Sequence, residues 1–197
     1  MTEQIACMFR DLFPSSKCLF LYRDVVPSAR SLHRMSMVLP SPRLATLTGC
    51  FSGHFTKMVV DAIGWVGSKY CVRLDNDLSF GALVYAVTTA TYLDMRRRGY
   101  NISALRYEDL VARPLDMCRV ILEFCHLPVS LAELAVKAFD FDAQRSSISA
   151  RSSIGQFTEQ QLAPKTKAEL NEMLKKFPVP LIGEPNVLEG TLSCINQ

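Results

Sequence analysis

The sequence lacks an apolar run of the roughly 18–20 residues that a membrane-spanning helix needs. Its most apolar long stretch, residues 80–93, contains three threonines, which favours a buried helix. The first residues show no basic segment followed by an apolar one, so no secretory leader is expected. The net charge is only +3, too small to predict a nucleic-acid partner.

Paired cysteine motifs are also absent. The seven cysteines form no C-x-x-C pair, and their odd number disfavours a disulfide scaffold as well as a zinc site. Most of them lie in apolar segments, so we expect buried free thiols in a reducing compartment and no metal.

What is present is enough apolar sequence, 49% of 197 residues, for one domain with a sizeable core. Strands are predicted at 17–22 and 103–107, because short apolar runs between polar flanks are typical of a buried parallel sheet. A loop is expected at 142–165 and an extended tail at 178–197. Periodicity and capping signals predict helices at 2–13, 27–38, 55–66, 77–98, 114–124, from 130, and 166–177. The alternation predicts a single α/β domain over 1–197, with a small parallel sheet and many helices.

A polar segment follows the first predicted strand. Arg23 comes at the strand end, and Ser31 lies in the helix expected from Pro27. Ligands of open α/β sheets bind at the carboxyl ends of strands, and Arg23 and Ser31 could both reach one phosphate. The alternative is a structural arginine that pairs with Asp24 or Glu108.

The second predicted strand ends in the same way. It leads into Arg106-Tyr107-Glu108-Asp109-Leu110, and Pro114 then starts a helix that is followed by Leu127-Pro128. Two such strand ends in one sheet could line one crevice.

Together these two segments resemble the sulfotransferase family, which transfers a sulfuryl group from 3′-phosphoadenosine 5′-phosphosulfate (PAPS). The resemblance implies a P-loop-like three-layer fold, with Arg23 and Ser31 on the 3′-phosphate of the cofactor and Tyr107 on its adenine. Arg151, in a late basic and glycine-containing stretch, is the candidate for the loop that closes over the same phosphate. Glu108 and Asp109 would stabilise the turn and the start of the following helix rather than bind substrate.

One part of the family pattern is missing. None of the nine glycines forms a glycine-rich loop after a strand, the element that cradles the 5′-phosphosulfate in the family. We therefore expect an N-terminally truncated form, either a fragment or a divergent member, whose catalytic base is unknown. Three histidines are available for that role: His33, His54 and His126. Of these, only His54 lies in the region predicted to shape the acceptor side.

The expected function is transfer of a sulfuryl group from PAPS to a hydroxyl or amine of a small-molecule or carbohydrate acceptor, leaving adenosine 3′,5′-bisphosphate (PAP). The alternative is a catalytically inactive module that binds PAP or a protein partner, so enzyme activity itself stays open. No nucleic-acid partner and no membrane span are expected, and a homodimer remains an alternative to a monomer. A cytoplasmic location is the default, and the Golgi lumen is the alternative if an N-terminal anchor precedes this sequence.

Overall fold

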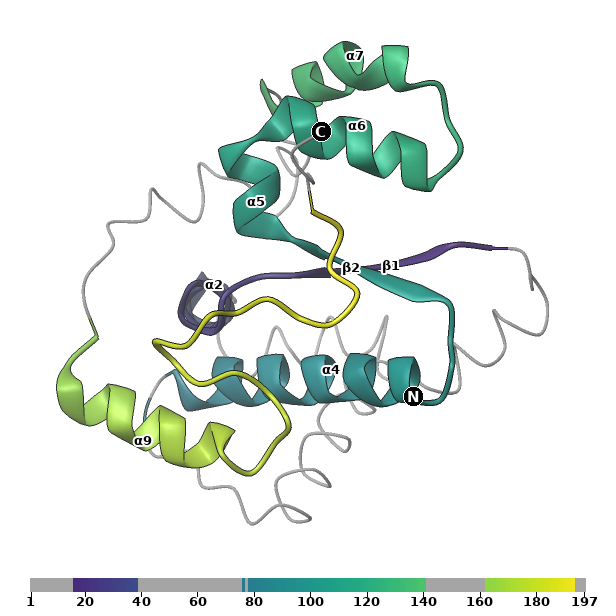
Figure 1. Ribbon diagram of the computed structural model, residues 1–197. Helices are drawn as coiled ribbons and strands as arrows, with labels where there is room; N and C mark the ends of the chain where they lie inside the picture. Colours follow the sequence, from purple (N-terminus) through teal and green to yellow (C-terminus); the bar gives the residue numbers. More distant parts are fainter. Residues whose placement is uncertain (1–15, 39–75, 77, 141–161, 194–197) are drawn as a thin grey trace, which may run out of the picture. The chain divides into compact units, whose positions relative to one another are not determined.

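The computed structural model describes residues 16–38, 76, 78–140 and 162–193 (Figure 1). The predicted helices at 2–13 and 55–66 and most of the predicted loop at 142–165 lie outside these ranges. The chain forms two compact units: unit 1 comprises Met1–Asp24, Thr88–Phe141 and Pro185–Gln197, and unit 2 comprises Val25–Val87 and Asp142–Glu184. Each unit is described by itself below.

The sheet of unit 1 has two parallel strands, as the sequence predicts. Strand β1 (Cys18–Tyr22) pairs with β2 (Ile102–Arg106) in a register that aligns Cys18 with Ile102 and Tyr22 with Arg106. Because the strands are parallel, both carboxyl ends lie at the same edge of the sheet.

The C-terminal segment runs along the other side of β2 (yellow in Figure 1). The Ala104 amide donates to the Gly190 carbonyl at 2.9 Å, and the Leu192 amide donates to the Ala104 carbonyl at 2.8 Å. This is the bonding pattern of a parallel ladder. The segment around Thr191 therefore supplies a short third row to the sheet.

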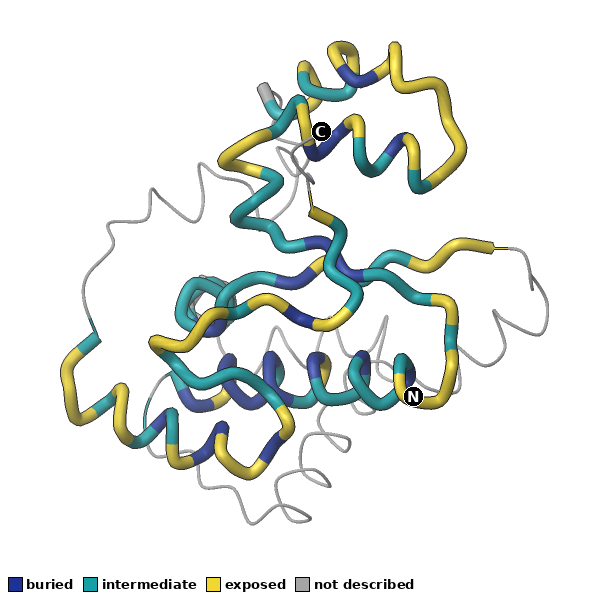
Figure 2. The backbone as a smooth tube through the Cα atoms, in the orientation of Figure 1, coloured by how far each residue is buried: buried dark blue, intermediate teal, exposed yellow. Residues whose placement is uncertain are grey.

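A compact apolar cluster holds the sheet, the tail and the end of α4 (Ser79–Arg97) together. The Phe20 ring stacks on the Tyr92 ring with centroids 4.7 Å apart. The Tyr92 hydroxyl donates to the Glu189 carbonyl at 2.6 Å, so its polar end is satisfied inside the cluster. The buried members, dark blue in Figure 2, are Tyr22, Tyr92, Ala104 and Leu188.

Helix α4 ends where the sequence predicts. Gly99 adopts a left-handed φ of 82°, its amide donates to the Arg96 carbonyl at 2.9 Å, and the Tyr100 amide donates to the Met95 carbonyl at 3.1 Å. These two bonds form a Schellman motif, which satisfies carbonyls that the helix itself leaves unpaired. Within the described ranges, α4 and the other helices are too short or too polar to cross a membrane.

A group of short helices follows β2. Helix α5 (Tyr107–Ala112) begins directly at the strand end, and α6 (Pro114–Phe124) begins at the predicted proline. Two 3-10 turns, η1 (Val129–Leu131) and η2 (Ala138–Asp140), flank α7 (Ala132–Lys137). Cys118, Leu122 and Ala132 form the small core between α6 and α7.

In unit 2 the described helices are α2 (Val25–Val38), the first half of α4 and α9 (Pro164–Leu174). Helix α2 begins two residues before Pro27, which is harmless because the first-turn amides of a helix have no intrahelical partner. Helix α9 begins two residues before the predicted Thr166, and Leu170 and Leu174 bury its inner face.

The cysteine prediction is only partly correct. All three described cysteines are free thiols, but only Cys118 is buried, whereas Cys18 and Cys125 are exposed. Cys18 stands at the start of β1 and Cys125 follows the last residue of α6, and at these element ends apolar neighbours in the sequence do not ensure burial.

The described residues form a mixed α/β fold with a small parallel sheet and mostly helices.

Candidate functional site

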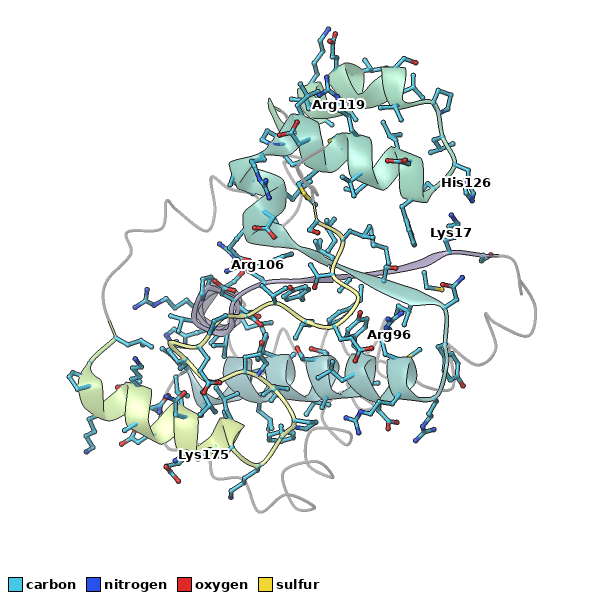
Figure 3. The ribbon with its side chains drawn as sticks, in the orientation of Figure 1. Lys17, Arg96, Arg106, Arg119, His126 and Lys175 are labelled. Atoms are coloured by element: carbon cyan, nitrogen blue, oxygen red, sulfur yellow. The ribbon has the colours of Figure 1, made fainter. Side chains whose placement is uncertain are left out.

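The two strand ends of unit 1 bring six chemistry-bearing side chains together, and we call this group the strand-end cluster. It comprises two arginines, three carboxylates and one aromatic ring. Arg106 closes β2 at the point where α5 begins, as Figure 3 shows. The members are Arg23, Asp24, Arg106, Tyr107, Glu108 and Asp109.

The tightest contact of the cluster joins Arg106 to Asp24. Arg106 Nη2 donates to Asp24 Oδ1 at 3.0 Å and to Oδ2 at 2.9 Å, and Nε donates to Oδ1 at 3.3 Å. The planar guanidinium therefore spans the carboxylate, a geometry that lysine could not reproduce. This hydrogen bond raises the pKa of Arg106, while partial burial acts in the opposite direction.

The C-terminal segment adds a further contact to this pair. Asn186 Nδ2 donates to Asp24 Oδ1 at 2.9 Å. Nearby, the Tyr22 hydroxyl donates to the Asn186 carbonyl at 3.2 Å and lies 3.0 Å from Thr191 Oγ1. Asp24 is thus held by Arg106 and by Asn186, so the C-terminal segment helps to position the strand ends.

Arg23 lies against Tyr107 and Glu108. Its guanidinium carbon is 4.8 Å from the centroid of the Tyr107 ring, a cation–π arrangement. Its Nε is 3.6 Å from Glu108 Oε1, within ion-pair range but longer than a hydrogen bond. The pairing with Glu108 that the alternative interpretation of the sequence expects is therefore present.

Glu108 contacts both strand ends. Its Oε1 accepts a hydrogen bond from the Asp24 amide at 3.1 Å. Its Oε2 is buried, accepts no hydrogen bond from the described residues, and lies 3.8 Å from Arg106 Nε. Glu108 and Asp109 both stand in the first turn of α5, where negative charge complements the helix dipole, in agreement with their predicted structural role.

The charge of the cluster is slightly negative. Two guanidinium groups face three carboxylates, since Asp109 Oδ1 also lies 3.7 Å from Arg106 Nη1. An anion that binds at Arg23 must therefore compete with carboxylates already in place, above all with Glu108.

The structure brings two of the four predicted cofactor residues together. Arg23 and Tyr107 follow neighbouring parallel strands and touch each other. Ser31 is the seventh residue of α2 and belongs to unit 2, so its action with Arg23 on one phosphate stays a prediction. Arg151 lies outside the described residues.

Sequence reasoning missed the Arg106–Asp24 pair and Asn186. Arg106 and Asp24 were visible as polar residues at strand ends, but only the parallel register, with Tyr22 beside Arg106, makes them neighbours. Asn186 gives no sequence signal, because its position depends on the tail returning along β2.

The structure describes two of the three histidines. His33 lies on α2, and His126 adopts a left-handed φ of 56° after the end of α6. At that position its amide donates to the Glu123 carbonyl at 2.9 Å, a helix-ending role. His54 lies outside the described residues, and in the described part of the chain no three His, Cys, Asp or Glu side chains are arranged to hold a metal ion.

Comparison of the chain with protein-family models, with curated proteins and with solved structures finds no match. The assignment of the strand-end cluster therefore depends on its sequence motifs and its geometry.

Proposed function

We propose that the chain is a sulfotransferase-like protein that binds the 3′-phosphoadenosine part of PAPS or PAP through Arg23 and Tyr107 of the strand-end cluster. The observation that carries the proposal is the contact between Arg23 and Tyr107. The two residues come from separate sequence motifs that resemble the family, they follow adjacent parallel strands, and their side chains touch. The side chains proposed to bind the phosphate and the adenine thus lie side by side, which binding of one nucleotide requires.

The chemistry of the two side chains suits this ligand. A guanidinium donates two parallel N–H bonds to a phosphate, and an aromatic ring offers a face or an edge to a purine. Because Arg23 covers one face of Tyr107 in the free protein, adenine would use the other face or the edge, unless Arg23 moves onto the phosphate. The P-loop-like three-layer fold and the contribution of Ser31 and Arg151 belong to the same proposal.

The reaction proposed for the chain is sulfuryl transfer to a hydroxyl or amine of a small-molecule or carbohydrate acceptor. The second candidate is an inactive PAP-binding module. It differs from the transferase in that it needs no glycine-rich loop, whose backbone amides would stabilise the transferred group.

Calorimetric titration with PAP tests the binding proposal. The wild-type chain should bind PAP, and Arg23→Ala should bind about tenfold to hundredfold more weakly, because it loses a charge-assisted phosphate contact of about 1.5–3 kcal/mol. Arg119→Ala is the matched control: Arg119 is half exposed on α6, pairs with Asp116, and should leave the affinity unchanged. Absence of binding by folded wild-type protein would contradict the proposal.

A turnover assay separates the two candidates. Purified protein is incubated with PAPS and a panel of hydroxyl and amine acceptors, and formation of PAP is measured. Acceptor-dependent PAP formation that Arg23→Ala reduces would support the transferase. Tight PAP binding without turnover would support the inactive module.

A further inference from the structure

Glu108 lies against the same guanidinium group, that of Arg23, to which the nucleotide phosphate is proposed to bind. Its Oε1 lies 3.6 Å from Arg23 Nε and also accepts the Asp24 amide. Arg23 therefore already faces an anion in the ligand-free protein.

The two arginine–carboxylate contacts of the cluster differ in length. Arg106 has short contacts of 2.9 and 3.0 Å to both oxygens of Asp24, and Asn186 fixes that carboxylate further. The contact of Arg23 with Glu108 is longer than a hydrogen bond. The Arg106–Asp24 pair is thus suited to remain in place, whereas the Arg23–Glu108 pair is suited to exchange.

The environment of Glu108 favours the exchange. Its Oε2 is buried without a hydrogen bond from the described residues, and a buried oxygen without a donor is costly. The carboxylate is therefore incompletely satisfied where it stands. A phosphate offers Arg23 three acceptor oxygens and more negative charge than one carboxylate.

We propose that Glu108 is an internal competitor of the 3′-phosphate: its carboxylate neutralises Arg23 in the free protein and gives Arg23 up when the nucleotide binds. The inference rests on the proposed function, and it concerns regulation of the same site. Glu108 acts on the ligand through Arg23 and is a positioning residue. It keeps the empty cluster from binding other anions strongly and lowers the affinity for PAP.

The chain offers a matched pair of variants to test this. Glu108→Gln removes the competing charge and retains an oxygen that can accept the Asp24 amide. Asp109→Asn removes the same charge from the next residue of α5, but Asp109 lies 3.7 Å from Arg106, whose guanidinium Asp24 already holds. Both variants therefore share the general electrostatic effect of one lost carboxylate, and only Glu108→Gln removes a carboxylate that faces Arg23.

Calorimetric titration with PAP gives the readout. Glu108→Gln should bind PAP about threefold to fivefold more tightly than the wild type, as expected for release of a partly exposed ion pair. Asp109→Asn should stay within about twofold. A gain in affinity is informative, because a structural defect at the start of α5 would weaken binding.

Glu108→Ala is the second variant in case the glutamine variant folds poorly, and it should also bind PAP more tightly than the wild type. Wild-type binding of PAP with no gain in either Glu108 variant beyond that of Asp109→Asn would overturn the competitor role alone. No PAP binding by the folded wild type or by any variant would overturn the proposed function and the competitor role with it.

Discussion

Asp24 and Arg106 should show a clear coupling energy in a double-mutant cycle. The perturbations are Asp24→Ala, Arg106→Ala and the double variant, with the free energy of unfolding measured for each. The pair joins the two strand ends, so its loss should destabilise the sheet and the start of α5. Its coupling reports how firmly the strand-end cluster is held in the free protein.

The expected magnitude follows from geometry and exposure. Two short N–H···O contacts to both carboxylate oxygens would be worth about 1.5–3 kcal/mol if fully shielded. The side chains are 24% and 34% exposed, and exposed pairs contribute only about 0.2–1 kcal/mol. We therefore expect a coupling of about 1–1.5 kcal/mol.

The control cycle uses Asp94 and Arg98, a pair on α4 with an equally short N···O distance of 2.8 Å but with side chains that are 42% and 52% exposed. Its coupling should be about 0.3–0.5 kcal/mol, typical of a helical pair four residues apart. Urea unfolding followed by circular dichroism measures both cycles. A coupling for Asp24 and Arg106 no larger than that of the control would refute the reasoning.

Two further predictions concern the fold. Gly81→Ala should destabilise the protein by about 1–3 kcal/mol in urea unfolding, although alanine is the better helix former, because its Cβ would lie 2.5 Å from the Ala29 Cα; unchanged or higher stability would contradict the packing of α4 on α2. Burial is the largest cause raising the pKa of Tyr92, so the folded state retains the phenolic proton better than the unfolded chain. This contribution to stability is complete below the ordinary tyrosine pKa of about 10 and is lost as pH rises through the folded value. Between about pH 9 and 11 the unfolding free energy should therefore fall more steeply for the wild type than for Tyr92→Phe. Equal slopes would contradict a raised pKa of Tyr92 in the folded state.

The sequence predicts the local elements of this fold well. The apolar runs before Arg23 and Arg106 are the two strands, and Pro114 and Gly99 mark the start of α6 and the end of α4. These signals act over a few residues, through burial, a fixed φ or a left-handed helix end, so the residues themselves carry them.

What the sequence did not predict depends on contacts between distant segments. Helix α5 begins without a loop after β2, so the strand predicted at 103–107 runs one residue into it, and no helix is predicted at 107–112. The bond from Asn186 to Asp24 requires the tail to lie along β2. Arg106 forms its short hydrogen bonds with Asp24 and only longer ion pairs with Glu108 and Asp109. This preference follows from the strand register and from distances that sequence spacing does not contain.

The central claim is that Arg23 and Tyr107 bind one nucleotide, and a crystal structure of the protein with PAP tests it most directly. The account predicts the 3′-phosphate within hydrogen-bond distance of the Arg23 guanidinium, the adenine against Tyr107, and Glu108 withdrawn from Arg23. The Arg106–Asp24 pair should be unchanged. PAP bound elsewhere on the protein, with Arg23 still facing Glu108, would contradict the account.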